Sequence, residues 1–237
     1  MRAVILAGGQ GVRLKPFTTV LPKPLVPIGG EKTILEIVIQ QLSSCGFTHI
    51  TLAINYLAQL IMAFFGDGSK WGIQIDYSLE NQPLSTIGPL TLIEDLPENF
   101  LVMNGDILCD LDYRAFFEHH LNRKNDLTVS SFQRNTRIDF GVLKYDDNYR
   151  LVDFLEKPTY QFDVTMGINC LNRSLISKIP RNIPYGFDHL MKDAIKNKYK
   201  IEIKPFGGFW LDIGRPEDYD YVNENFEDLK NKMGLKE

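Results

Sequence analysis

The sequence feature that most constrains the fold is the junction near the N-terminus where an apolar segment runs into glycine. Residues 3–7 read Ala-Val-Ile-Leu-Ala, and Gly8, Gly9 and Gly11 follow within four positions. A short apolar run bounded by glycines predicts a buried strand. Glycines after such a strand permit positive φ and let backbone N–H groups approach an anion closely. The junction therefore predicts a phosphate-binding loop at the carboxyl end of a core strand.

Two cationic residues follow this loop, Arg13 and Lys23. A guanidinium binds phosphate oxygens as a fork and an ammonium acts as a point charge, so together they can hold a triphosphate. The glycine spacing fits neither G-x-x-x-x-G-K-[ST] nor G-x-G-x-x-G, so neither of those motifs applies. The alternative is a tight strand-to-helix turn with solvated charges.

The order of predicted elements indicates an α/β fold. In the first half, strands at 49–54, 72–77 and 100–103 are interleaved with helices at 33–45 and 57–65. Such alternation predicts parallel βαβ units with right-handed crossovers, and therefore a Rossmann-like, mainly parallel sheet flanked by helices. In an open sheet of this kind, ligands bind beyond the carboxyl ends of the strands.

The second half is expected to add a small antiparallel extension over the active site. Its strands are predicted at 127–132, 140–145, 151–154 and 164–171, before a helix at 187–198, strands at 201–204 and 209–213, and a last helix from Pro216 through Phe226. A chain of 237 residues can form one such domain or at most two small ones. We expect a single domain over residues 1–237, with halves at 1–125 and 126–237.

The composition limits the classes of binding partner that the protein can have. A net charge of -4 argues against nucleic acid binding, which normally needs a basic surface. The sequence shows no run of 18 apolar residues and no leader segment. We therefore expect a cytoplasmic protein that does not associate with a membrane. Cys45, Cys109 and Cys170 are expected to be reduced core thiols, and His119 and His120 to lie at the surface. A homo-oligomer is left open.

The N-terminal residues resemble a known family. Leu6-Ala7-Gly8-Gly9-x-Gly11-x-Arg13-Leu14 with Pro22-Lys23-Pro24-Leu25 resembles the signature of the sugar-1-phosphate nucleotidylyltransferases, which include the mannose-1-phosphate guanylyltransferases. The sequence contains no hexapeptide repeat, so we do not expect the β-helical tail that some relatives carry. The resemblance implies that NTP and a sugar 1-phosphate are the substrates, that Arg13 and Lys23 contact the triphosphate, and that Mg²⁺ completes the site. It also implies a nucleotide-binding loop of Leu6, Ala7, Gly8, Gly9, Gly11 and Val12.

Two aspartates are candidate metal ligands. Asp106 follows the apolar run 100–103, and Mg²⁺ prefers one or two carboxylates completed by substrate phosphates. On local sequence alone, an ordinary turn aspartate is an equal alternative. The resemblance implies that Asp106 and Asp212, in a Trp-x-Asp-x-Gly pattern, bind the metal. It places Asn104 and Gly105 against the nucleotide.

A third motif is Phe154-Leu155-Glu156-Lys157-Pro158. The resemblance implies that Lys157 binds the phosphate of the sugar 1-phosphate, that Glu156 binds sugar hydroxyls, and that Gly141 and Gly167 approach the sugar. A fixed cation beside a dianionic nucleophile offsets its repulsion from the triphosphate. An exposed Glu-Lys pair before a turn proline is the alternative. Met166 departs from the family pattern before Gly167.

The base is predicted from residues 77–89, the position of the base-reading loop, which includes Ser85 and Thr86. Glu80 only accepts hydrogen bonds, and guanine N1–H and N2–H₂ are adjacent donors, so GTP is favoured. Ser85 and Ile87 depart from the family pattern. The predicted activity is guanylyl transfer to a mannose- or heptose-like sugar 1-phosphate, with Arg13, Lys23, Asp106, Lys157 and Asp212 as the catalytic residues. Uridylyl, cytidylyl or thymidylyl transfer and a non-catalytic NDP-sugar-binding regulator remain alternatives.

Overall fold

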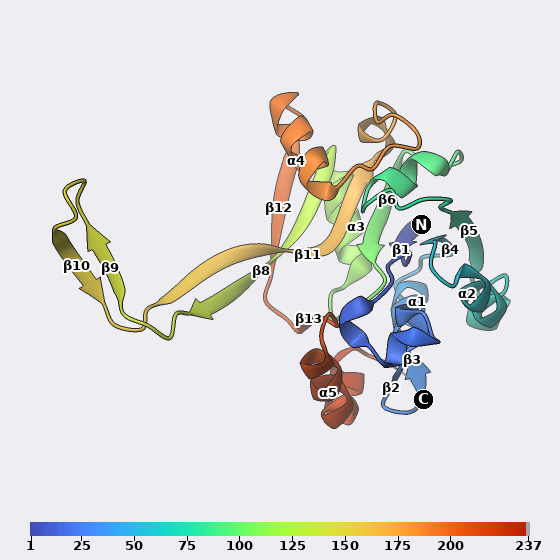
Figure 1. The fold of residues 1–237 in the computed structure, drawn as a ribbon. Coiled ribbons are helices and arrows are strands. Elements are labelled where there is room, and N and C mark those ends of the chain that lie inside the picture. The colour runs from blue at the N-terminus through green and yellow to red at the C-terminus, as the bar shows by residue number, and fades with distance from the viewer. Residues whose placement is uncertain (236–237) are drawn as a thin grey trace.

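The computed structural model describes residues 1–235, and its centre is a seven-stranded sheet in the order β12-β8-β11-β6-β1-β4-β5 (Figure 1). The strands are β1 (Arg2–Leu6), β4 (His49–Ile54), β5 (Gln74–Leu79), β6 (Asn99–Asn104), β8 (Leu127–Arg137), β11 (Thr159–Asn172) and β12 (Ile201–Phe206). β1 pairs in parallel with β4 and β6, β4 with β5, and β12 with β8, whereas β11 runs antiparallel to β6 and β8. The predicted Rossmann-like, mixed but mainly parallel sheet is confirmed.

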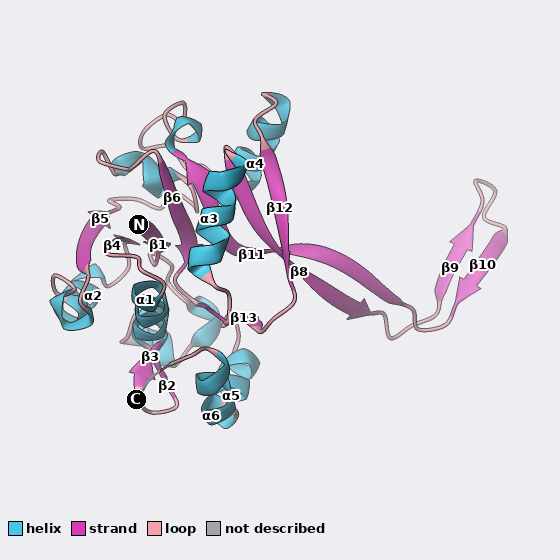
Figure 2. Cartoon of the chain, turned by 180° about the vertical axis from the view of Figure 1, so that it is seen from behind, coloured by secondary structure: helices cyan, strands magenta, loops and turns pink. Residues whose placement is uncertain are grey.

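Helices cover both faces of the sheet (Figures 1 and 2). Side chains of α1 (Ile34–Ser44), α2 (Ala58–Phe65) and α3 (Tyr113–Arg123) share one core cluster with β1, β4 and β6. The opposite face of these strands packs against α4 (Phe187–Lys196). Ala3 and Ile5 of β1 point to the first cluster and Val4 to the second, as the period of two in a strand requires. A strand buried on both faces explains the continuous apolar run in the sequence.

Local signals set the ends of α1. The Thr33 hydroxyl accepts a hydrogen bond from the Glu36 N–H at 3.2 Å, and the Glu36 carboxylate accepts one from the Thr33 N–H at 2.9 Å, which forms a capping box. Gly46 then adopts φ +84° just beyond the helix, a conformation that favours glycine. Thr33 is therefore the cap and not the first helical residue.

The C-terminal segment packs under the glycine loop. Its strand β13 (Trp210–Asp212) pairs with β7 (Ile107–Cys109), and two helices follow β13, α5 (Pro216–Glu224) and α6 (Phe226–Lys232). Nearer the N-terminus, β2 (Pro27–Ile28) pairs with β3 (Lys32–Thr33). The sequence predicted one continuous helix across α5 and α6. The helix is interrupted at Asn225, whose backbone leaves the helical conformation and whose side-chain amide donates to the Tyr221 carbonyl. Buried Val222 and Phe226 join Leu14 in a third core cluster.

A long projection, residues 133–165, leaves the body of the protein, and we call it the arm. It contains the outer parts of β8 and β11 and the two-stranded ribbon of β9 (Val142–Tyr145) and β10 (Leu151–Leu155). Figure 1 shows the arm reaching away from the body, at the left of the view. None of residues 133–165 is buried. The predicted antiparallel extension is thus present. The expectation that it lies over the active site is wrong for its outer part, which points away from the rest of the fold because the β8–β11 pairing carries it outward (Figure 1).

Two further expectations can be compared with the structure. Cys45, Cys109 and Cys170 are free thiols, as predicted, but only Cys109 and Cys170 are buried, whereas Cys45 is partly exposed. Burial raises the pKa of Cys109 to about 11. The surface expectation for His120 is wrong. His120 is fully buried, because it lies on the face of α3 that packs on the sheet, and its ring nitrogens bond Thr128 Oγ1 at 2.9 Å and Asn99 Oδ1 at 3.1 Å. Among the described residues, no helix has the length and apolarity to cross a membrane.

Candidate active site

The pairing of β7 with β13 brings Asp106 and Asp212 together from opposite halves of the chain. Asp212 lies opposite Ile107, and the Ile213 N–H donates to the Asp106 carbonyl at 3.0 Å. Gly105, immediately before Asp106, donates its N–H to the Leu6 carbonyl at 2.9 Å. A Cβ on Gly105 would lie only 3.1 Å from Ile5 Cγ2, so glycine lets this turn sit against β1. The two carboxylates therefore lie at the carboxyl end of β1 and β6, beside the glycine loop.

Lys23 and Arg13 bring positive charge to the two carboxylates. Lys23 is buried, and its ammonium forms an ion pair with Asp106 Oδ2. The guanidinium of Arg13 lies against Gly214, two residues after Asp212. Partial burial raises the pKa of Asp212, and the neighbouring Asp106 carboxylate raises it further, whereas Lys23 and Arg13 lower it. The four residues thus form one electrostatically coupled group.

The glycines of the loop have different roles. Only Gly11 of the three has a positive φ, at +61°, and a Cβ there would lie 2.9 Å from Thr18 and 3.1 Å from the Lys23 side chain. Gly8 lies close to two side chains, because a Cβ there would be 2.8 Å from Glu80 Oε1 and 3.3 Å from Asn55 Cβ, so a larger residue would displace the Glu80 carboxylate. A Cβ on Gly9 would meet nothing within 4 Å. The loop is therefore open at Gly9 and tightly packed on either side.

The residues flanking these glycines divide into supporting and open positions. Ala7 is buried and donates its N–H to the Ala53 carbonyl at 2.8 Å, so it joins the sheet and offers no free donor. Val12 is exposed, at the start of a short 3₁₀ turn, Val12–Leu14, that carries Arg13. A phosphate would thus meet the loop from Gly8 onward.

Glu80 lies beside the glycine loop, at the end of β5. Its Oε2 accepts a hydrogen bond from the Leu84 N–H at 3.1 Å, and its backbone carbonyl accepts one from the Asn55 side chain at 2.8 Å. Burial raises the pKa of Glu80, while the Leu84 N–H lowers it. Oε1, next to Gly8, is the oxygen that faces the loop.

The three departures from the family pattern fall outside the charged group. Ile87 and Met166 are each 1% exposed and pack in the core. Ser85 is exposed with φ +65°, a conformation that glycine adopts without strain. Met166 therefore adds bulk to the core, and Ile87 adds bulk both to the core and to the wall of a small hollow beside Thr86. The neighbouring Thr86 accepts a hydrogen bond at Oγ1 from the Phe187 N–H at 2.8 Å, at the start of α4.

A small hollow of about 110 Å³ unites residues that the sequence predicted separately. Leu6, Thr86, Asn104 and Gly167 line it together, although they come from four distant segments. Gly167 has φ +75°, and a Cβ there would lie 2.8 Å from the Asn104 side chain. Asn169 also lines the hollow, is 5% exposed, and its Oδ1 has no hydrogen-bond partner among the described residues. Sequence analysis missed Asn169, whose only signal is a polar residue inside an apolar strand.

A larger hollow of about 520 Å³ lies on the other side of Asp212. Two residues that the sequence singled out, Arg13 and Asp212, line it together with Arg134, on the part of β8 nearest the body, and Arg215, the residue before α5. Sequence analysis missed both of these arginines, because nothing in the local sequence separates them from solvated surface charges. The three guanidiniums outnumber the carboxylates of Asp212 and Asp218 that also line the hollow, and this excess of positive charge favours an anionic ligand.

Three of the predicted sugar-binding residues lie away from Asp106 and Asp212. Gly141, Glu156 and Lys157 are exposed at the base of the β9–β10 ribbon on the arm. A Cβ on Gly141 would lie 2.5 Å from the Phe154 ring and 3.4 Å from Glu156 Oε2, so these residues form their own group. Thr159, next but one to Lys157, precedes Gly167 by eight positions on an extended strand, or roughly 25 Å. The structure does not bring these three residues to Asp106 and Asp212.

The carboxylates of Asp106 and Asp212 are suited to a divalent cation whose remaining ligands come from water and the substrate. Asp106 Oδ1 is buried and has no hydrogen-bond partner among the described residues. Within residues 1–235, no group of three or more His, Cys, Asp or Glu side chains is placed to hold a metal ion. Mg²⁺ commonly takes one or two carboxylates and obtains its other ligands from water and substrate phosphates. Asp106 and Asp212 fit that pattern and do not form a complete cage.

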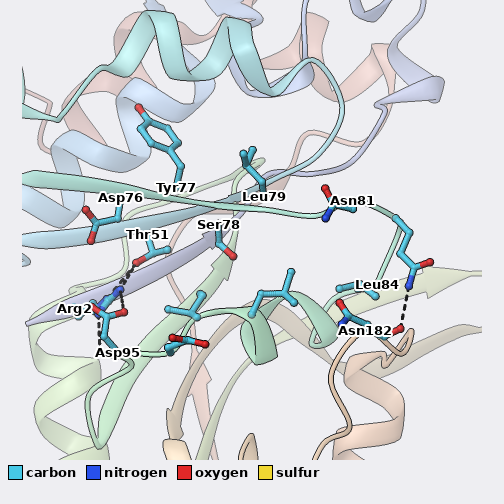
Figure 3. A pocket seen from close by; sticks show the side chains of 14 residues that line it. Arg2, Thr51, Asp76, Tyr77, Ser78, Leu79, Asn81, Leu84, Asp95 and Asn182 are labelled. Atoms are coloured by element: carbon cyan, nitrogen blue, oxygen red, sulfur yellow. Dashed lines mark hydrogen bonds and ion pairs between the residues drawn. The ribbon is translucent and has the colours of Figure 1, made fainter.

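Another hollow, of about 610 Å³, lies along β5 and is separate from this site (Figure 3). The Arg2 guanidinium at its base bonds Asp95 at 2.8 Å and Thr51 Oγ1 at 2.8 Å. The Gln82 side chain at its rim donates to the Asn182 carbonyl at 3.0 Å. Arg2 is thus engaged within the fold, and its ion pair holds the pKa of Asp95 below its usual value.

Comparison with known proteins gives the family. Residues 2–228 match the family model described as Nucleotidyl transferase. Proteins named mannose-1-phosphate guanyltransferase from Aspergillus oryzae and Neurospora crassa are each 33% identical over 92% of this chain. This chain spans 62% of the length of these relatives.

Two solved structures share the fold. HddC from Yersinia pseudotuberculosis, solved in complex with GMP-PN, has a TM-score of 0.73 and 29% identity and covers 95% of this chain and 99% of its own. A putative glucose-1-phosphate thymidylyltransferase from Bacillus anthracis has a TM-score of 0.77 at 23% identity, with 96% of each chain covered. At that identity the second likeness concerns the fold alone.

Proposed function

This chain belongs to the nucleotidyl transferase family, and we propose that it transfers a nucleotidyl group from an NTP, most favourably GTP, to a mannose- or heptose-like sugar 1-phosphate. The observation that carries the proposal is the coupled group of Arg13, Lys23, Asp106 and Asp212 beside the glycine loop. It joins anion-binding and carboxylate groups at the sheet edge where α/β folds bind nucleotides. Because nucleoside triphosphates are cytoplasmic metabolites, the reaction also suggests a cytoplasmic location.

The proposed reaction is an in-line displacement at the α-phosphorus. A phosphate oxygen of the sugar 1-phosphate forms a new bond to the α-phosphorus. The bond between the α-phosphorus and the oxygen that bridges it to the β-phosphorus breaks, and pyrophosphate leaves with that electron pair. Arg13 and Lys23 offset the charge that develops on the leaving group. Because the nucleophile is already an oxyanion, the step needs no general base.

Asp106 and Asp212 are the residues that would hold Mg²⁺. The ion supplies charge stabilisation to phosphate oxygens when it is bound. Lys23 is the cation paired with Asp106, and it would contact the triphosphate if a bound cation neutralised that carboxylate. The buried Oδ1 of Asp106 is the acceptor that no described residue satisfies.

Glu80 supports the choice of guanine. Its Oε1 lies at the glycine loop, where it can accept from a base whose phosphates lie along that loop. A carboxylate accepts from guanine N1–H and N2–H₂ together, and neither uracil nor thymine presents such a donor pair. Two relatives also point to guanine by name, the mannose-1-phosphate guanyltransferases and HddC in complex with GMP-PN.

The experiment is a substrate panel. The purified protein, with Mg²⁺, is given GTP, UTP, CTP, ATP or dTTP with mannose 1-phosphate, a heptose 1-phosphate or glucose 1-phosphate, and pyrophosphate is detected after pyrophosphatase. We expect the highest kcat/KM with GTP and a manno-configured sugar. Faster turnover with UTP or dTTP would replace guanine in the proposal. Binding of an NDP-sugar without turnover on any pair would favour a regulatory relative.

A further inference from the structure

The arm presents a surface that a soluble monomer rarely exposes. Eight large apolar side chains on it are 52–84% exposed: Phe140, Leu143, Tyr145, Tyr149, Leu151, Val152, Phe154 and Phe162. An aromatic side chain offers about 200 Å², so these eight present on the order of 900 Å². A standard protein interface buries about 800 Å² on each partner. The arm therefore carries enough apolar surface for one macromolecular interface.

Strand register places much of this surface on one face. Phe154 lies opposite Leu143 and Leu151 lies opposite Tyr145 in the β9–β10 pair, and directly opposed residues share a face. Tyr149 stacks on Tyr145 at 5.5 Å between ring centroids. The other face carries the Lys144–Asp153 ion pair at 2.8 Å. An isolated two-stranded ribbon is marginally stable in water, so the apolar face needs a cover.

The chain's own body is badly placed to provide that cover. Seven consecutive residue pairs, from Ser131–Thr165 out to Arg137–Thr159, hold β8 against β11 without a break. The register shift lies between Thr165 and Asn169, where the ribbon leaves the sheet. Returning the outer arm to its own cleft would require breaking or sharply bending this paired ribbon.

Glu156 and Lys157 lie on the arm and not in the cleft, whose cations beside Asp212 are Arg13, Arg134 and Arg215. The proposed function needs a cation for the phosphate of the sugar 1-phosphate. The family resemblance implies that role for Lys157, which lies beyond Thr159 on the arm. The body also has an uncovered apolar patch beside Arg13, formed by Val12, Phe17, Val20 and Leu21, which are 38–72% exposed. A second copy of this chain is a partner that offers both a cleft for Lys157 and an apolar patch for the arm.

We propose that two copies of this chain exchange arms, so that the apolar face of each arm packs on the body of the other copy and Glu156 and Lys157 complete the partner's sugar-phosphate site. The exchange is reciprocal under two-fold symmetry, which needs only one type of contact and closes as a dimer. The assignment of Lys157 rests on the proposed function. The dimer itself rests on the exposed surface and the register of the arm.

The first test measures the oligomeric state by sedimentation velocity. We expect a dimer for the wild-type protein and a monomer for the double variant Leu143→Glu and Phe154→Glu, which places charge on the apolar face. The matched control, Lys144→Ser on the opposite face of the same ribbon, should remain a dimer. Circular dichroism checks that the body stays folded, since neither substituted residue belongs to its core. A monomeric wild type, or a dimer that survives the double variant, overturns the exchange.

The second test asks which copy supplies Lys157. Lys157→Ala and Asp106→Asn chains are co-expressed with different tags, and the mixed dimer is purified through both. With exchanged arms, one of its two sites has both wild-type residues, so it should recover about half of the wild-type activity. Mixed dimers that stay as inactive as each parent overturn supply from the partner and favour closure within one chain.

A third measurement separates failure of this proposal from failure of the proposed function. Cys45 is the partly exposed native thiol, so all chains carry Cys45→Ser. Chains with Lys157→Cys are mixed with chains with Arg215→Cys and treated with a short bismaleimide. Cross-links between chains of different tags support the exchange even if no sugar 1-phosphate is turned over. A doubly substituted chain that cross-links only within itself overturns it.

Discussion

Lys23 and Asp106 form an ion pair across 83 residues of sequence, and this pair leaves the second oxygen of Asp106 buried without a partner among the described residues. A buried acceptor of this kind costs free energy unless a ligand satisfies it. Asp106 Oδ1 would therefore be available to hold a bound cation, and Lys23 would then be the cation available to an anionic substrate.

Asp106→Asn should abolish most activity. The amide keeps the size of the carboxylate but loses its charge, so we expect turnover with Mg²⁺ to fall by about two orders of magnitude or more. Pyrophosphate release in a coupled assay measures it, and removal of Mg²⁺ by EDTA should have a similar effect on the wild type. Asp220→Asn, an exposed carboxylate on α5, is the matched control and should be unaffected. Near-normal turnover of Asp106→Asn would remove this residue from the site.

Glu80→Gln should weaken the preference for guanine. A neutral amide replaces the charged acceptor for N1–H and N2–H₂, so the thermal shift produced by GTP should shrink more than the shifts with UTP or CTP. Glu118→Gln, on the exposed surface of α3, serves as control. An equal loss for all nucleotides would mean that Glu80 supports the glycine loop and does not read the base.

Arg215→Ala tests the larger hollow. Loss of one charge-assisted hydrogen bond costs about 1.5–3 kcal/mol, which corresponds to a roughly ten- to hundredfold lower kcat/KM. Steady-state kinetics on both substrates measure it, with Lys204→Ala on the exposed surface of β12 as the charge control. If both variants keep wild-type kinetics, the hollow holds no substrate phosphate.

Asn169→Leu separates ligand binding from stability. The unpartnered Oδ1 of Asn169 contributes nothing to the fold, so an apolar replacement should leave the Tm of the free protein unchanged or higher. If Asn169 bonds a substrate hydroxyl in the small hollow, the same variant should raise the KM for the sugar 1-phosphate. A lower Tm with an unchanged KM would make Asn169 a structural residue.

Buried His120 should make stability depend on pH. Burial lowers the pKa of His120 from its ordinary value of 6.5 to about 4. Above pH 6.5 neither state binds the proton, and between pH 6.5 and 4 only the unfolded chain does, so stability falls as the pH decreases. One proton contributes at most about 1.4 kcal/mol per pH unit.

The measurement for His120 is urea denaturation at several pH values. His120→Gln keeps polar atoms near Thr128 and Asn99 and removes the titrating group, so its stability should vary less between pH 6.5 and 4. Parallel curves for the two proteins would show that other groups determine the slope.

The sequence by itself determined the local parts of this protein. The apolar run before Gly8 specified β1 because a strand buried on both faces needs apolar residues throughout, and Thr33 and Glu36 specified the start of α1 through bonds within one turn. The sequence also singled out Lys23, Asp106 and Asp212. Each lies in a short segment that the family resemblance makes recognisable in the sequence alone.

Only the tertiary structure decided which of these residues meet. The β7–β13 pairing joined Asp106 to Asp212, and the β8–β11 pairing carried Lys157 away from them along the arm. Arg215 and Asn169 acquired their positions from packing that no local pattern encodes, and His120 was buried because its helix face met the sheet. Contacts between residues far apart in sequence depend on strand order and register, which are set by the whole core and not by any one segment.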